Sequence, residues 1–478
     1  MAKIGIIKDK DLSYDCKTPF HPARNYPEYP FGQFSEKNAV YNAVRELFHQ
    51  MGLDNPNYNH PSWNPLGETI KPGNTILLKP NWVKHFNVAS EIDCMLTHSS
   101  VVRAVLDYAY IALKGQGRII IADASIQECD FKKLVAYTGL NELARFYNEN
   151  ASLKVEVGDL RLTASHKSKS GAIVREQLHG DKSGYVAVDL KDRSQLYPIR
   201  EDYKKFRVTC YDKEEMILHH NKEKNEYLIP KSVLESDVII NLPKLKTHRK
   251  AGMTCSLKNI VGINGCKDWL PHHRFGSTEE GGDEYLYKSL RKKLATKLIE
   301  KRDVAVKKYW AGLLTLMVLL IRGTNRIIPP KDSYLEGSWY GNDTLARTIA
   351  DLNKIAFYAD RNGVLQETVQ RKMLIVVDAI IAGEREGPLE PHPKPCGLLV
   401  AGYNPLLVDL VCSRIMGFDY QKMPHFKHTL KSISSKSFHQ ALADIEFTCG
   451  KCNDLDDVYT AYGDDFIPTK GWRGHVEL

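Results

Sequence analysis

Lysine side chains follow two apolar segments of the sequence. Lys79 and Asn81 end the segment TILLKPN, and Lys244 and Lys246 follow the segment VIINLP. Apolar runs of this length are typical of strands that are buried on both faces of a parallel sheet. In such sheets, ligands bind beyond the carboxyl ends of the strands. We therefore expect these lysines to gather at one sheet edge and to bind a small phosphorylated or carboxylated molecule.

The basic segment continues through His248 toward a predicted helix at residues 256–262. Thr254 precedes that helix, and Lys258 and Asn259 lie within it. A helix N-terminus presents unpaired N–H groups and a partial positive charge, so it favours an anion. The predicted substrate-binding residues are Lys79, Asn81, Lys244, Thr254, Lys258, Asn259, Arg274 and Glu386.

Acidic residues end two other apolar segments. MLIVVD ends in Asp378, and RIIIAD ends in Asp123. Asp409 lies in the apolar helix pattern NPLLVDLVCSRIMG, where a buried carboxylate needs a partner. A lysine with a pKa lowered by burial, or a carboxylate with a raised pKa, can act as a catalytic base. The predicted catalytic residues are Lys246, His248, Asp378 and Asp409.

The segment LPHHRFGSTEEGGDEY carries several residues that bind metals. His272, His273 and Asp283 are the candidate ligands for a divalent ion, although their spacing identifies no particular metal. The alternative hypothesis is thus a metal-dependent enzyme that polarises its substrate. The cofactor stays unassigned, and the reaction type, whether transfer, ligation or isomerisation, stays open.

Composition narrows the classes of protein. The sequence has 66 Lys and Arg residues and 58 Asp and Glu residues, a mild excess of positive charge over 478 residues. This excess is too small to indicate a nucleic-acid-binding protein. The ten scattered cysteines and the charged N-terminal segment predict a reducing, cytoplasmic location. Walker, GxGxxG, HExxH and GxSxG motifs are absent from the sequence. The oligomeric state is not predicted.

One uncharged segment, YWAGLLTLMVLLI at residues 309–321, bears on membrane contact. Its thirteen residues fall short of the roughly 20 that a spanning helix needs. We favour a buried helix. The third hypothesis is a non-enzymatic subunit that attaches to a membrane surface through this segment and the basic residues before it.

The pattern of elements predicts an α/β fold, in which a mostly parallel sheet is covered by helices and carries an antiparallel insertion and a helical excursion. The predicted parts are an irregular N-terminal arm at 1–70, α/β core at 71–153, a polar antiparallel insertion at 154–230, core at 231–275, the helical excursion at 276–360, core at 361–425, and a C-terminal tail at 426–478.

Several motifs together resemble the domain of unknown function 362 family: LLKPN, INLPKLKTH, SLKNIVGI and LLVAGYNPLLVDLVCSRIMG. KDWLPHHR, EEGGDEY and WYGNDT resemble a bacterial subgroup, some of whose genes neighbour polysaccharide-biosynthesis genes. The resemblance implies functional positions but no reaction. Some relatives carry ferredoxin-type cysteine clusters, but this sequence lacks that four-cysteine spacing, so no iron–sulfur cluster is expected. The family's lysines and acids fall on Lys79, Lys244, Lys246, His248, Lys258, Asp378 and Asp409.

Overall fold

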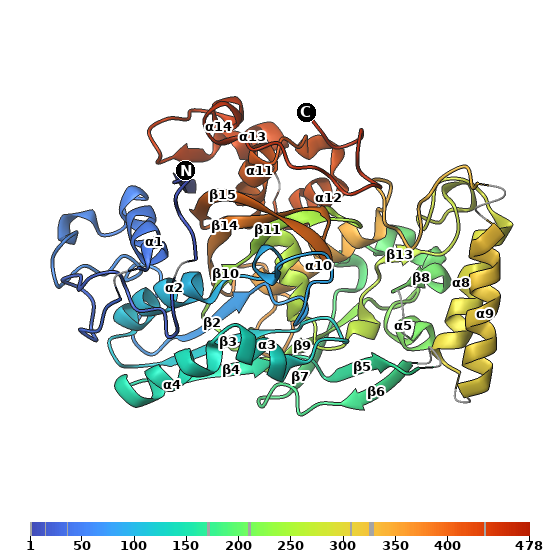
Figure 1. Ribbon diagram of the computed structural model, residues 1–478, viewed down its shortest axis with the longest axis horizontal. Coiled ribbons are helices and arrows are strands. Elements are labelled where there is room, and N and C mark those ends of the chain that lie inside the picture. Colours follow the sequence, from blue (N-terminus) through green and yellow to red (C-terminus); the bar gives the residue numbers. More distant parts are fainter. Residues whose placement is uncertain are drawn as a thin grey trace.

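The computed structural model describes residues 2–14, 16–35, 37–169, 173–208, 212–305, 308–324, 329–434 and 436–478. At its centre is a ten-stranded sheet with helices on both faces (Figure 1). Most strand pairs are parallel, and β15 pairs antiparallel with both β1 and β14. This arrangement confirms the predicted α/β class.

Eight strands form the main path of the sheet. Their order is β16 (Ile445–Phe447), β1 (Ala2–Lys8), β15 (Glu390–Gly402), β14 (Lys372–Glu386), β10 (Val238–Leu242), β2 (Thr75–Pro80), β3 (Arg118–Asp123) and β4 (Val155–Asp159). β11 (Lys244–His248) pairs with the far half of β14, and β12 (Gly252–Thr254) pairs with β11.

Successive strand residues point into two separate cores, because side chains alternate along a strand. Ile76 and Leu78 of β2 pack in one core, and Leu77 packs in the other. The first core is covered by α1 (Ala39–Gln50), α2 (Ser99–Leu113), α3 (Phe131–Tyr137) and α4 (Leu140–Asn150). The second is covered by α10 (Thr344–Tyr358), α11 (Pro405–Ile415), α12 (Pro424–Ile433), α13 (Phe438–Ala443) and α14 (Leu455–Tyr462).

The predicted antiparallel insertion is present as two hairpins, although β4 at its start belongs to the main sheet. One hairpin joins β5 (Thr163–Lys167) to β6 (Ile173–Gln177), and the other joins β7 (Tyr185–Asp189) to β9 (Glu226–Pro230). The pair β8 (Phe206–Arg207) and β13 (His273–Arg274), with α5 (Lys213–His219) and α6 (Lys231–Leu234), completes this region.

The helical excursion contains a hairpin of two helices, α8 (Leu290–Asp303) and α9 (Lys308–Thr324), which forms one end of the molecule (Figure 1). The prediction that residues 309–321 form a buried helix is wrong, since Tyr309 is 63% and Leu320 is 64% exposed. The segment is helical but stands outside both cores. Among the described residues, no helix has the length and apolar content that crossing a membrane requires.

Both chain ends differ from the prediction. The N-terminal arm begins with β1, which pairs with β15 inside the sheet, and the C-terminal tail supplies β16, which pairs with β1.

The region around Asp378 also differs from the prediction, because β14 continues past Asp378 to Glu386. Lys244 and Lys246 lie in a further strand, β11.

Candidate functional site

A cavity of about 200 Å³ lies at the carboxyl ends of β2 and β3. We call it the lysine cavity. Its described lining residues contain four basic residues and one acid: Arg249, Lys250, Lys258, Lys267 and Asp123. The remaining polar lining includes Asn81, Trp82, Ser125, His248, Thr254, Asn259 and His272. A small basic cavity thus lies at the edge of the parallel sheet, where ligands bind in folds of this class.

Lys79 lies behind the cavity wall and forms an ion pair with Asp123, the acidic residue of the cavity. The Lys79 Nζ is 2.7 Å from the Asp123 Oδ1, and both side chains are buried. Lys79 also donates to the Asn259 Oδ1 at 3.2 Å and to the Pro80 carbonyl at 3.1 Å. Burial lowers the pKa of Lys79, although Asp123 opposes that change. Asp123 is therefore paired with Lys79, although its charge also acts on Lys258 and Lys267 and raises the pKa of each against the effect of burial.

Lys258 and Lys267 form no ion pair with a described residue. Neither side chain makes a hydrogen bond or ion pair with any residue that the structure describes. Burial lowers the pKa of Lys267 from 10.5 to about 7. Burial and the nearby Lys79 lower the pKa of Lys258 to about 8. Lys267 is 7% exposed and Lys258 is partly exposed, and a buried cation is costly without a partner.

Two uncharged donors in the wall are also unsatisfied. The Trp82 Nε1 and the Thr254 Oγ1 are buried and have no hydrogen-bond partner among the described residues. A buried polar group without a partner costs about 1–3 kcal/mol. Both residues line the lysine cavity, so an anion bound there would restore their hydrogen bonds.

The two cavity histidines have opposite tautomers. The His248 Nδ1 accepts from the backbone N–H groups of Lys250 (3.0 Å) and Ala251 (3.1 Å), so the proton is on Nε2. The His272 Nδ1 lies 2.7 Å from the Leu270 carbonyl and must donate to it, which leaves a lone pair on Nε2.

Both imidazoles are neutral near pH 7. Burial, followed by the charge of Lys258, lowers the pKa of His248, and burial with the charges of Lys250 and Lys258 lowers that of His272. His248 therefore offers an N–H donor to the cavity, and His272 offers a proton acceptor.

An asparagine network connects the cavity wall to the sheet. The Asn259 Nδ2 donates to the Lys79 carbonyl at 3.0 Å and to the Asn241 Oδ1 at 2.7 Å. Asn81 donates to the Asn259 Oδ1 at 3.0 Å and accepts from the Lys246 Nζ at 2.6 Å. Asn81 and Asn259 thus have structural partners on the side away from the cavity.

Lys246 lies one layer behind Asn81 and does not line the cavity. It also donates to the Met95 carbonyl, and it is fully buried. Burial and the neighbouring Lys244 lower its pKa. The predicted proton-transfer role of Lys246 would therefore have to act through Asn81.

Lys244 and Asp378 form a separate buried cluster. The Lys244 Nζ is 2.8 Å from both the Asp378 Oδ2 and the Tyr14 hydroxyl. Asp378 also accepts from the Tyr14 hydroxyl and from the His98 backbone N–H. Both charges of the ion pair are fully buried, and neither residue lines the lysine cavity. The cluster joins the N-terminal segment to β11 and β14.

Asp409 caps the short helix α7 (Ser256–Asn259). It accepts from the backbone N–H groups of Ser256 (2.8 Å) and Leu257 (2.9 Å). Asp409 therefore occupies two of the N–H groups that we expected to face an anion. Burial raises the pKa of Asp409 to about 6. Its position explains why a carboxylate lies in an apolar helix.

The remaining predicted residues lie elsewhere. Arg274 is within 4.0 Å of Asp202, Asp283 and Asp343, and Glu386 accepts from the Lys470 backbone N–H. Asp283 accepts from Thr344. The structure therefore does not bring Arg274 or Glu386 to the lysine cavity.

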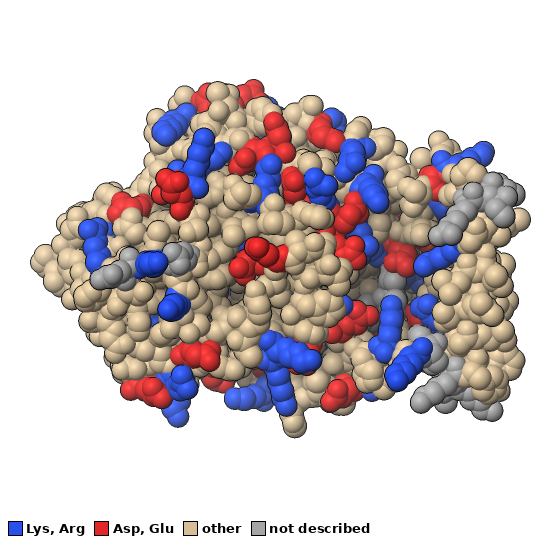
Figure 2. All heavy atoms as spheres, viewed as in Figure 1, with Lys and Arg blue, Asp and Glu red and all other residues tan. Residues whose placement is uncertain are grey.

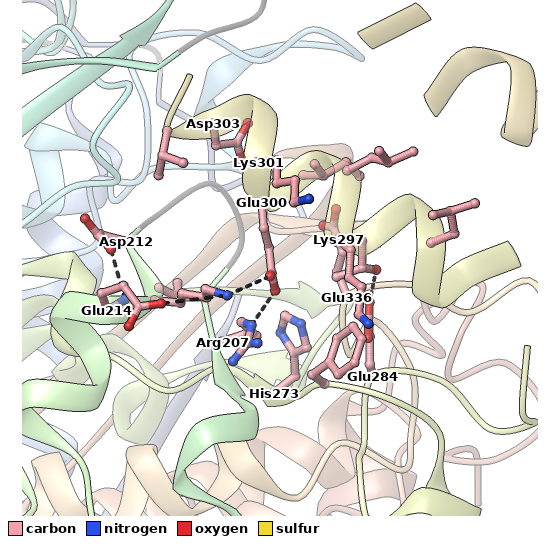
Figure 3. Close-up of a pocket in the computed structure, with 18 residues that line it drawn as sticks. Arg207, Asp212, Glu214, His273, Glu284, Lys297, Glu300, Lys301, Asp303 and Glu336 are labelled. Atoms are coloured by element: carbon pink, nitrogen blue, oxygen red, sulfur yellow. Dashed lines mark hydrogen bonds and ion pairs between the residues drawn. The ribbon is translucent and has the colours of Figure 1, made fainter. Parts of the chain in front are cut away.

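His273 lines a second cavity, of about 450 Å³, between α8 and the β8–β13 pair. Figure 3 shows it beside Arg207, whose guanidinium is paired with Glu300 of α8. His272 lines the other cavity and Asp283 neither, so the candidate metal ligands do not form one site. No three His, Cys, Asp or Glu side chains in the described residues are arranged to hold a metal.

The sequence prediction missed Lys267, Trp82 and Asp123 as site residues. Asp123 was visible as a strand-end acid, the same signal that pointed to Lys79. Lys267 lies between Cys266 and Asp268, where it resembles an ordinary surface charge. Its burial follows from tertiary contacts, which a local pattern does not contain.

Gly262 lies against the Lys79–Asp123 ion pair. A Cβ atom there would be 2.6 Å from the Lys79 Nζ and closer still to the Asp123 Oδ1. We expect Gly262→Ala to separate the pair and lower the free energy of unfolding by about 3–5 kcal/mol, the usual cost of breaking a buried ion pair.

Urea unfolding measures this effect. Gly312→Ala is the control, because its Cβ would meet nothing within 4 Å and its helix should gain about 0.5–1 kcal/mol. Wild-type stability of Gly262→Ala would show that the pair does not depend on this close approach.

Comparisons with known proteins identify a family. No curated protein matches the sequence. One solved structure that matches is the crystal structure of a protein from Thermotoga maritima, with 11% sequence identity and a TM-score of 0.29. That match covers 78% of this chain and 58% of the other, so the chain spans less than two thirds of that protein's length. A family model described as "Domain of unknown function (DUF362)" matches residues 171–414, which include both cavity histidines, Lys258 and Lys267. The chain belongs to the DUF362 family.

Proposed function

We propose that this chain is an enzyme that binds a small anionic molecule, phosphorylated or carboxylated, in the lysine cavity. One observation carries the proposal: Lys258 and Lys267 line a partly open cavity and form no ion pair with any described residue. A buried cation without an ion-pair partner lowers the stability of the folded protein. Their retention is explained if a ligand supplies the missing negative charge.

The cavity favours a compact, multiply charged group. At about 200 Å³ it is smaller than the roughly 300–1,000 Å³ of drug-sized ligand sites. Two ammonium groups, the Trp82 indole N–H and the Thr254 hydroxyl offer donors to several oxygens at once. A phosphate group accepts that many hydrogen bonds, and a larger molecule would place its phosphate here and extend outward.

The histidines supply the chemistry in this proposal. The His272 Nε2 is the proton acceptor, and the His248 Nε2–H is the donor. One acceptor and one donor beside an anion site support general acid–base catalysis on the bound molecule. Lys79, Asn81, Asn259 and Asp409 position the wall, while Lys244 and Asp378 hold the strands behind it.

Cysteine chemistry supports a reducing location for this activity. Among the described residues, all nine cysteines are free thiols. Proteins of reducing compartments such as the cytoplasm keep their cysteines in this form. We therefore place the activity in the cytoplasm, where phosphorylated sugars and other acidic metabolites are available as substrates. Relatives encoded beside polysaccharide-biosynthesis genes make phosphorylated sugars the first class to test.

A thermal-shift screen at constant ionic strength tests the proposal. The compounds are inorganic phosphate, sugar phosphates, nucleotides and carboxylic acids. A ligand that binds only the folded protein raises its stability in proportion to RT ln(1 + [L]/Kd), about 2.7 kcal/mol at 100 times Kd.

We expect stabilisation by phosphorylated compounds, and none for Lys258→Met. Lys427→Met is the matched control, since Lys427 is exposed on α12. Stabilisation that is the same in all three proteins would place the anion elsewhere.

A further inference from the structure

The helix α9 exposes a stripe of large apolar side chains. Tyr309, Leu313, Leu316 and Leu320 recur at helical spacing and are 63%, 46%, 53% and 64% exposed. Residues at positions i, i+4, i+7 and i+11 lie on one face of a helix. Trp310 and Met317 border the stripe and are also exposed.

This stripe is not the face that packs within the hairpin. Ala311 and Val318, on the opposite side of α9, are buried, and α9 packs against α8. A helix on a protein surface normally turns polar residues to solvent. Here both faces are apolar, so the outer face is suited to a partner.

The hairpin is also basic. α8 contains six basic residues against two acids, and α9 contains no acidic residue. Lys292 and Lys293 pair with Asp332 and Glu280, but Lys297 and Lys301 are exposed and have no carboxylate partner in the described part of the chain. Figure 2 shows the outer surface at this end as largely uncharged, bordered by lysine and arginine side chains.

We propose that the α8–α9 hairpin docks on a membrane surface that contains anionic lipids. α9 would lie in the plane of the headgroups with its apolar stripe inserted. Its 17 residues span about 25 Å at 1.5 Å each, less than the roughly 30 Å hydrocarbon core. Tyr and Trp side chains prefer the headgroup level, which suits Tyr309 and Trp310 at the start of the helix.

Charge favours lipid over a second copy of the chain. A two-fold dimer places the same patch of both copies face to face, so the basic residues of the two hairpins would repel one another. An anionic lipid surface attracts each nearby lysine by about 1 kcal/mol. The unpaired Lys297 and Lys301 therefore fit a lipid surface better than a self-complementary interface.

Vesicle sedimentation and tryptophan fluorescence test the proposal. The vesicles are phosphatidylcholine with or without phosphatidylglycerol. Five of the six tryptophans are at most 8% exposed, so Trp310, at 49%, dominates any change on binding. We expect full-length protein to sediment with the anionic vesicles, its emission to shift to the blue, and both effects to weaken in high salt.

Variants separate the two contributions. Leu316→Ser with Leu320→Ser should lower the partition coefficient about tenfold or more, because two inserted side chains are lost. Lys297→Gln with Lys301→Gln should reduce binding to anionic vesicles only. The matched control is Val364→Ser with Val369→Ser, which alters two valines that are each 55% exposed outside the hairpin.

Two results would overturn the proposal. One is failure of the wild-type protein to bind anionic vesicles at low salt. The other is a dimer, seen by sedimentation equilibrium, that the leucine substitutions dissociate, since a second copy would then cover the stripe. Phosphate binding in the lysine cavity is measured on the same variants and should not change. Failure of this proposal can therefore be distinguished from failure of the proposed function.

Discussion

Replacing Lys258 and Lys267 together with methionine is expected to abolish stabilisation by phosphorylated ligands and to stabilise the ligand-free protein. Both effects follow from one cause. Lys267 is buried, Lys258 is partly exposed, and neither forms an ion pair with a described residue, so the folded state bears a desolvation cost that a ligand would relieve. Methionine fills similar space without charge. Because Lys267 is 7% exposed, we expect its replacement alone to raise the free energy of unfolding by about 2 kcal/mol or more.

The destabilisation by Lys267 also makes the stability of the ligand-free protein depend on pH. The folded-state pKa of Lys267 is about 7, below the 10.5 of the unfolded chain. Between these values the unfolded state binds more protons, so the stability of the ligand-free protein rises with pH across that window. Below pH 7 the cost is fully present.

Urea unfolding at several pH values measures it. The stability difference between Lys267→Met and wild type should be largest at or below pH 7 and should narrow toward pH 10. A variant that is less stable than wild type at pH 7 would contradict the absence of a compensating partner. Lys427→Met again serves as the control.

Replacing His272 with glutamine is expected to lower kcat by about 10²–10⁴-fold, the usual contribution of a general base. Glutamine keeps a polar side chain in the wall but has no basic nitrogen. Anion binding depends on Lys258 and Lys267, so ligand-induced stabilisation should remain. The measurement is turnover of whichever phosphorylated compound the screen identifies. His439→Gln is the control, since His439 is exposed on α13.

The pH profile of kcat/KM tests the same assignment independently. Burial holds the pKa of His272 well below its usual 6.5, so the base stays deprotonated and activity should not fall between pH 7 and pH 6.5. On the alkaline side, kcat/KM should fall as the free enzyme loses protons from Lys267 and Lys258, near pH 7 and pH 8. An acidic limb near 6.5, or undiminished turnover of His272→Gln, would remove His272 from the base role.

The sequence was sufficient to predict the parallel strands and the sheet edge at which the lysine cavity lies. Apolar runs such as residues 75–78 fix a strand, and the residue that follows must emerge at its carboxyl end. Lys79, predicted in this way, lies behind the cavity wall. Thr254 and Lys258, predicted from the helix that follows them or contains them, line the cavity.

Other positions depended on tertiary contacts. Asp378 was predicted at a strand end, but β14 runs on and places it in the sheet interior beside Lys244. Lys246 has the same sequence context as Lys244 yet donates to Asn81 from the opposite side of the wall. α9 shows the converse case: an apolar helix predicts burial, and only its place outside both cores reveals an exposed stripe.

The central claim is that Lys258 and Lys267 bind an anionic ligand. Isothermal titration calorimetry at pH 8, in two buffers of different ionisation enthalpy, tests it most directly. The probe is a phosphate monoester, which is already dianionic at pH 8 because its second pKa is about 6. An anion that binds beside these lysines raises their pKa values from about 7 and 8, so binding must take up protons. We predict net proton uptake by the wild-type protein and little or none by Lys258→Met with Lys267→Met. Equal binding by both proteins, without proton uptake, would contradict the account.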